Sequence, residues 1–201
     1  MSEKRKLILK LYEIGCLKFG KFKLSSGIES PFYFNLRILP MYPTIMKNVA
    51  KLALEVLSKE TFDLVVGIAT GGIPLAAYIS CLGDIPMTYV RKEEKKHGLQ
   101  RLVEADVNGK KVVIIDDVAT TGSTLLKAVK SVQHAGGIVK ACFVVIDREQ
   151  GAKERLSREN IRLISLLTTT EIVDTLRQEK MISDNMAEIV INYIKRVRLD
   201  A

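Results

Sequence analysis

Short apolar segments alternate with helical segments through the middle of this 201-residue chain. Each apolar segment has the length of one buried strand, and the residues between them place apolar side chains at helical spacing. The expected strands are FDLVVGIA (62–69), PMTYVR (86–91), KVVIID (111–116), IVKACFVVI (138–146) and IRLISLL (161–167). Strands that are apolar along most of their length and alternate with helices predict a parallel sheet covered by helices on both faces. We therefore expect an α/β fold, with a doubly wound core over about 43–167.

Capping residues set limits to the helices. Pro43 suits the first turn of a helix, and Gly136 with Gly137 suits a helix end. Thr168 and Glu171 have the spacing of a capping box, which predicts that another helix begins after the last strand. Helices are expected at 43–59, 73–82, Ser123–His134 and 151–159, with two more in the C-terminal tail.

The first 42 residues differ from this pattern. Apolar residues in MSEKRKLILKLYEIGCL fall at helical spacing, but Lys10 and Glu13 interrupt them, which favours an amphipathic helix over a signal peptide. The stretch FGKFKLSSGIESPFYFNLRILP follows, and its Gly, Ser and Pro residues divide it into short extended pieces. We expect 1–201 to form one domain, in which about 1–42 and the C-terminal helices make a small hood over the core.

Composition indicates which class of partner the protein binds and in which redox compartment it works. The net charge of +8 indicates anionic partners, which are nucleic acids, acidic surfaces or phosphorylated small molecules. Cys16, Cys81 and Cys142 form no Cys-x-x-Cys pair and lie in apolar settings, which predicts buried thiols in a reducing, cytoplasmic compartment. No apolar run approaches the roughly 20 residues of a membrane span. With two His residues and dispersed Cys residues, a zinc site is not expected.

The run VVIIDDVATTGST (112–124) carries the strongest chemical signal. Asp116 and Asp117 follow a fully apolar strand, where unpaired carboxylates are costly and need partners. The next residues, ATTGST, offer hydroxyls and backbone N–H groups at a helix N-terminus, which together suit a phosphate. Carboxylates for a diol beside amides for a phosphate describe the two ends of ribose 5-phosphate. The alternative is a strand end with an N-cap and chance acids.

Two further loops follow expected strands. In GIATGGIPLA (67–76) a Thr-Gly-Gly turn lets backbone amides approach an anion, although a tight turn without a ligand would look similar. In RKEEKKHGLQR (91–101) five basic residues and a His occupy a long connection. Such a run is often a solvated loop, but long connections in compact domains also act as lids.

These motifs resemble those of the type I phosphoribosyltransferases, whose signature is an apolar strand, two acids and a loop that holds the ribose 5-phosphate of phosphoribosyl pyrophosphate (PRPP). The resemblance implies catalytic roles for Lys95, Asp116 and Asp117, and Mg²⁺ carried mainly on PRPP. Gly71 stands where many members have a lysine in the pyrophosphate loop. The PRPP-binding residues implied are Thr70, Gly71, Arg91, Lys92, Lys95, His97, Asp116, Asp117, Val118, Ala119, Thr120, Thr121, Gly122, Ser123 and Thr124.

Within that family, SSGIESPFYFNLR (25–37) and the 91–101 loop resemble the orotate phosphoribosyltransferases. The match implies orotate contacts from Tyr33, Phe34, Thr120 and Arg148, and a guanidinium can hold the carboxylate of orotate through two parallel hydrogen bonds. Ser25 replaces the family's usual lysine, and Lys23 is the candidate substitute. The implied reaction transfers a 5-phosphoribosyl group from PRPP to orotate.

The resemblance also implies a homodimer in which each 91–101 loop serves the partner's site, with no nucleic-acid or membrane partner. Two rivals stay open at this point. A purine or uracil phosphoribosyltransferase would share the 112–124 motif without a carboxylate clamp. A regulator could keep the fold as a ligand sensor and bind RNA or DNA through its basic surface, with steep salt dependence.

Overall fold

The computed structural model describes residues 2–23, 29–91 and 102–199. In chain order the elements are α1 (Glu3–Glu13), β1 (Leu17–Lys23), β2 (Glu29–Phe34), the 3₁₀ helix η1 (Leu36–Met41), α2 (Pro43–Leu57), β3 (Leu64–Ile68), α3 (Gly72–Gly83), β4 (Met87–Val90), β5 (Lys111–Ala119), α4 (Ser123–His134), β6 (Ile138–Asp147), α5 (Ala152–Ser157), β7 (Arg162–Thr168), α6 (Thr169–Gln178) and α7 (Asp184–Leu199).

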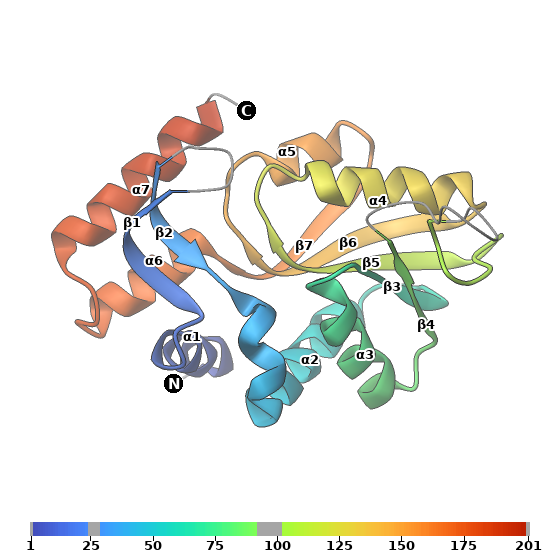
Figure 1. Cartoon of the computed structure of the whole chain (residues 1–201), viewed down its shortest axis with the longest axis horizontal. Coiled ribbons are helices and arrows are strands. Elements are labelled where there is room, and N and C mark those ends of the chain that lie inside the picture. Colours follow the sequence, from blue (N-terminus) through green and yellow to red (C-terminus); the bar gives the residue numbers. More distant parts are fainter. Residues whose placement is uncertain (1, 24–28, 92–101, 200–201) are drawn as a thin grey trace.

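A five-stranded parallel sheet lies at the centre, in the order β4-β3-β5-β6-β7. Helices α2 and α3 cover one face, and α4 and α5 cover the other (Figure 1). The predicted doubly wound α/β fold is therefore confirmed. The strand order reverses between β3 and β5, and open α/β sheets bind their ligands at the carboxyl ends of the strands beside such a reversal.

The predicted helix ends are also confirmed. At the end of α4 the amide of Gly137 donates to the carbonyl of Val132 at 2.9 Å, and Gly136 has a φ of +82°. Glycine meets that left-handed requirement without steric cost. At the start of α6 the amide of Glu171 donates to Thr168 Oγ1 at 3.2 Å, and the Glu171 carboxylate accepts from the Thr168 amide at 2.8 Å.

Strand β5 is longer than the sequence predicts. The apolar run ends at Ile115, but Asp116, Val118 and Ala119 continue the parallel pairing with β6. The two carboxylates therefore belong to the last residues of the strand and do not follow it. Hydrogen bonding to β6 maintains the extended backbone there although the side chains have become polar.

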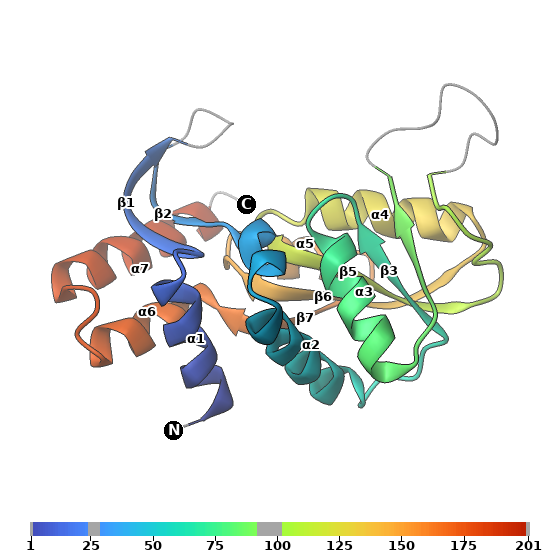
Figure 2. The same ribbon diagram turned by 60° about the horizontal axis from the view of Figure 1, so that its bottom comes forward.

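The hood is a second, smaller sheet. Strands β1 and β2 pair antiparallel and stand beside α7, while α1 lies next to α6 (Figure 2). Leu11 of α1 and Phe32 of β2 belong to the same buried apolar cluster as Val113 and Ile115 of the central sheet. This shared core holds the hood over the carboxyl ends of the strands.

Two of the three cysteines are buried as predicted, but Cys81 is exposed. Leu75, Ala76 and Ile79 face the core from α3, and Cys81 lies on the opposite side of that helix. The prediction that Cys81 is buried, which was based on its apolar sequence neighbours, is therefore wrong. Burial raises the pKa of Cys16 to about 12. Among the described residues, no helix is both long enough and apolar enough to cross a membrane.

Candidate active site

Two carboxylates at the end of β5 form the floor of the site. Asp116 is 8% exposed, and its carboxylate accepts a hydrogen bond from the Asp117 amide at 2.9 Å. The Asp117 carboxylate accepts one from the Val118 amide, also at 2.9 Å. Burial, together with the neighbouring charge of Asp117, raises the pKa of Asp116 well above its usual value, while Arg37 acts in the opposite direction. The site therefore keeps a carboxyl group where ionisation is unfavourable without a partner.

The Thr-Gly-Gly turn after β3 lies directly against this floor. A Cβ on Gly72 would come within 2.2 Å of the Ile115 carbonyl oxygen, and a Cβ on Gly71 would come within 2.6 Å of Asp117 Cγ. Glycine at both positions lets the turn approach β5 closely. The two motifs that the sequence singled out are thus adjacent, at the reversal of strand order, and the peptide bond between Ala69 and Thr70 is cis.

The close approach of Gly71 to Asp117 explains why a lysine does not simply fit there. We expect Gly71→Lys to displace the Asp117 carboxylate and to raise the KM for PRPP roughly tenfold, about the loss of one charge-assisted hydrogen bond. Steady-state kinetics with PRPP varied measure this effect. Tighter PRPP binding in the variant would contradict it.

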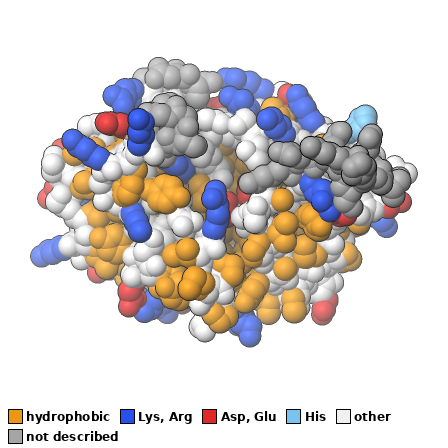
Figure 3. Space-filling view, viewed as in Figure 1, with side chains coloured by type: hydrophobic (Ala, Val, Ile, Leu, Met, Phe, Trp, Pro, Cys, Tyr) orange, Lys and Arg blue, Asp and Glu red, His pale blue; other side chains and the backbone are white. Residues whose placement is uncertain are grey.

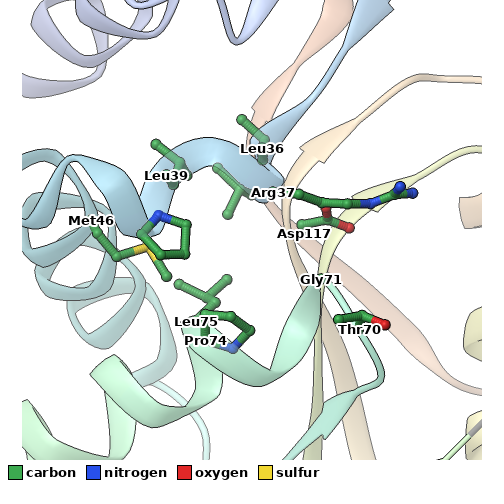
Figure 4. A pocket seen from close by; sticks show the side chains of 11 residues that line it. Leu36, Arg37, Leu39, Met46, Thr70, Gly71, Pro74, Leu75 and Asp117 are labelled. Carbon is green, nitrogen blue, oxygen red and sulfur yellow. The ribbon is translucent and has the colours of Figure 1, made fainter.

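A pocket opens beside this turn, between η1 and α3 (Figure 4). Leu36, Leu39, Met46, Pro74 and Leu75 form its apolar side. The polar side comes from Arg37 of η1, Thr70 of the Thr-Gly-Gly turn and Asp117 of β5. Figure 4 shows the Arg37 side chain alongside Asp117.

The predicted phosphate loop connects β5 to α4. Gly122 has a φ of +77°, and a Cβ there would lie within 2.9 Å of Ala152 Cα at the start of α5. Thr121 and Ser123 share a hydrogen bond between their hydroxyls at 3.1 Å. The loop therefore presents hydroxyls and the free N–H groups at the start of α4, which is the arrangement that binds phosphate groups.

Arg148 lies just beyond β6 and is 7% exposed. Its Nη2 donates to Ser30 Oγ at 3.3 Å, its Cζ lies 4.6 Å from the centroid of the Phe32 ring, and its buried Nε has no hydrogen-bond partner. Burial lowers the pKa of Arg148 from its usual value, while the phenol groups of Tyr193 and Tyr33 act in the opposite direction. No carboxylate of the described chain forms an ion pair with it. A buried cation without a partner among the described residues favours the binding of an anion beside it.

The predicted base-contacting aromatics differ in their surroundings. Tyr33 is 38% exposed, with its ring centroid 5.8 Å from that of Phe22. Phe34 is buried and packs against Phe19 and Phe32, so its ring belongs to the hood core. Lys23 is exposed at the end of β1, in register with Glu29.

Arg91 marks the base of the basic loop. Its side chain pairs with Glu104, and Val90 forms an antiparallel bridge with Val103. The hydrogen bond from Arg91 to Glu104 raises the pKa of the guanidinium. The predicted residues Ser25, Lys92, Lys95 and His97 lie outside the described residues.

The charges agree with anionic ligands. Most Lys and Arg side chains visible in Figure 3 lie in the upper half of that face, above the hollow between the hood and the core. Hydrophobic side chains gather below it.

Comparison with known proteins agrees with this geometry. The family model of the phosphoribosyl transferase domain matches residues 39–175. The orotate phosphoribosyltransferase of Sulfolobus acidocaldarius is 44% identical over 178 residues, which are 89% of this chain and 90% of that enzyme. This chain belongs to the orotate phosphoribosyltransferase family. The Methanocaldococcus jannaschii member is 42% identical over 87% of this chain and 99% of its own.

Solved structures extend the family assignment to the fold. Orotate phosphoribosyltransferase from Aeropyrum pernix superposes with a TM-score of 0.78 at 36% identity, over 88% of this chain and 99% of that one. UMP synthase from Leishmania donovani superposes with a TM-score of 0.88 at 30% identity, over 97% of this chain and 43% of the longer enzyme. Both the hood and the core of this family member therefore have counterparts in solved structures.

Sequence reasoning missed four polar or aromatic residues of this phosphoribosyltransferase site. Ser30 and Phe32 contact Arg148, Arg37 lines the pocket, and Gln150 is buried with an unpartnered Nε2. Alternation along β2 could have identified the first two, because Ser30, Phe32 and Phe34 share one face. Nothing in the local sequence marks Arg37 or Gln150.

Proposed function

We propose that this protein transfers the 5-phosphoribosyl group of PRPP to orotate, forming orotidine 5′-phosphate and pyrophosphate. The buried Arg148 guanidinium carries the proposal, because it lies at the site without an anionic partner among the described residues. Orotate has a carboxylate that can pair with it, whereas adenine, guanine and uracil have none. A charge-assisted pair in a buried site discriminates strongly between such bases.

In this proposal the core, about 43–167, binds PRPP and the hood binds the base. Asp116 and Asp117 would accept hydrogen bonds from the two ribose hydroxyls, and residues 119–124 would bind the 5-phosphate through backbone N–H groups and hydroxyls. Thr70 and Gly71 would bind the pyrophosphate. Tyr33 and Phe34 would contact orotate, with Phe34 doing so through its main chain because its ring is buried. Thr120 would add a further orotate contact.

The chemistry asks the protein for positioning and charge stabilisation more than for covalent catalysis. The family's oxocarbenium-like transition state places positive charge on the ribose, near the Asp116 and Asp117 carboxylates, while negative charge develops on the leaving pyrophosphate. Mg²⁺ would neutralise part of that charge. By the resemblance to the family, the ion would be held mainly by PRPP oxygens, with several water ligands retained.

The test is the fall in orotate absorbance that depends on both PRPP and Mg²⁺, run beside adenine, guanine, hypoxanthine and uracil. We expect loss of the orotate signal and no reaction with the other bases. Activity on a different base would keep the phosphoribosyltransferase and contradict the role of Arg148. A lack of activity with every base would contradict the proposed reaction and favour a regulator.

We also propose a homodimer in which Arg91, Lys92, Lys95 and His97 serve the partner's site. A mixture of Lys95→Ala and Asp117→Asn chains tests this arrangement. Each single variant should be nearly inactive, but random reassociation would give half mixed dimers with one complete site each, and thus about a quarter of wild-type activity.

Activity of the mixture that equals the average of the two variants would contradict the shared site. Dimers of each variant mixed without prior dissociation are the matched control. Size-exclusion chromatography with light scattering checks the oligomeric state of every sample.

A further inference from the structure

The hydroxyl of Ser30, in the hood, lies against the guanidinium of Arg148. The other hydrogen bonds of this hydroxyl determine whether it donates to the guanidinium or accepts from it. Ser30 is 2% exposed, and its Oγ donates to the Phe32 carbonyl oxygen at 2.8 Å. With that proton committed, the oxygen can only accept, and Arg148 Nη2 donates to it at 3.3 Å. The Phe32 amide approaches the same oxygen at 3.4 Å. Ser30 is therefore oriented as an acceptor for the guanidinium.

The ring of Phe32 supplies a second contact. Residues 30 and 32 are two apart on β2 and are both buried, so their side chains share the inward face of the strand. The Arg148 Cζ lies 4.6 Å from the Phe32 ring centroid, a cation–π distance. Tyr193 of α7 meets Phe32 edge to face at 5.9 Å and supports the ring. We call Ser30 and Phe32 the Arg148 seat.

These contacts leave one buried donor of Arg148 without a partner. The seat engages Nη2 and the guanidinium face, whereas Nε is buried with no hydrogen-bond partner. Both seat residues are neutral, so they hold the group without neutralising its charge. An arginine side chain is long and flexible, and holding it in place before the ligand arrives lowers the entropic cost of binding.

We propose that Ser30 is a positioning residue for Arg148 and thereby contributes to recognition of the base. This inference rests on the proposed function, because it assigns the remaining N–H donors of the guanidinium to the carboxylate of orotate. It also gives the hood a role in specificity through an arginine of the core. The base would be selected by the Arg148 guanidinium, which belongs to the core but is positioned by Ser30 of the hood.

Ser30→Ala tests the proposal. Losing one hydrogen bond should raise the KM for orotate about three- to tenfold, with the KM for PRPP and kcat within about twofold of wild type. Ser30→Cys keeps a side chain of similar size but offers a weaker acceptor, so it should also raise the KM for orotate. Ser131→Ala is the matched control, since its hydroxyl also donates to a backbone carbonyl, that of Lys127, but on α4.

A double-mutant cycle separates positioning from a structural role. In an Arg148→Ala background, Ser30→Ala should have almost no further effect on orotate kinetics, because the group that Ser30 orients is gone. An unchanged orotate KM in Ser30→Ala, an equal rise in both KM values, or a full effect in the Arg148→Ala background would each overturn the proposal. A wild-type protein inactive on orotate would instead overturn the proposed function.

Discussion

Replacing Arg148 with alanine should lower kcat/KM for orotate by about 30- to 1000-fold, equivalent to roughly 2–4 kcal/mol of transition-state binding. The reason is that the guanidinium is buried and lacks an anionic partner among the described residues, so the carboxylate of orotate would be its counter-ion. Arg148→Lys should recover only part of the loss, because an ammonium cannot form two parallel hydrogen bonds. Steady-state kinetics with orotate and with PRPP varied in turn measure both changes.

The loss should be specific to the base. Arg162→Ala is the matched control: this arginine lies on β7 in an exposed ion pair with Glu60, and its removal should leave orotate kinetics unchanged. Unchanged orotate kinetics in Arg148→Ala would remove the main support for base selection by this residue.

Much of the fold is predictable because local and global signals coincide in the core. Residues 64–68 and 112–115 are apolar and buried throughout, as strands covered on both faces require. Gly137 and Thr168 end and begin helices through contacts with near neighbours in the sequence. Motifs that follow strands also meet in space, because the carboxyl ends of parallel strands lie at one edge of the sheet.

The rest depends on contacts between distant residues. Ser30 and Arg148 are 118 positions apart, and neither sequence neighbourhood reveals that they touch. Tyr193 supports Phe32 from the C-terminal helix, which shows no chemical motif of its own. The exposure of Cys81 likewise follows from which face of α3 packs on the core. Such features depend on how distant elements pack against one another, which local patterns do not specify.

The second large effect concerns Asp116, where binding and stability should change in opposite directions. Asp116→Asn should lower kcat/KM for PRPP by about 10- to 100-fold, because a carboxylate that accepts from a ribose hydroxyl is replaced by a neutral amide. The same change should raise the Tm of the ligand-free protein, since burial and the charge of Asp117 oppose ionisation of Asp116. The site would thus trade stability for binding, as functional sites often do.

The pH dependence gives the sign of this stability difference. The folded-state pKa of Asp116 is raised above its unfolded value, so the folded protein holds the proton more tightly than the unfolded chain does. Stability of the wild type then falls as pH rises from about 4, the unfolded pKa, towards the folded pKa, whereas the asparagine variant lacks this loss. The Tm advantage of Asp116→Asn should therefore grow as pH rises through that window.

Asp147→Asn is the matched control for this experiment. Asp147 ends the neighbouring strand β6, is buried, and has its pKa raised by that burial, and its carboxylate accepts from the Glu149 amide at 2.8 Å. In both variants the Tm advantage over the wild type should grow with rising pH, but only Asp116→Asn should lose the rise in Tm that PRPP produces. Calorimetry from pH 4 to pH 7.5, with and without PRPP, distinguishes them. A PRPP-induced shift of wild-type size in Asp116→Asn would show that this carboxylate does not bind the ribose.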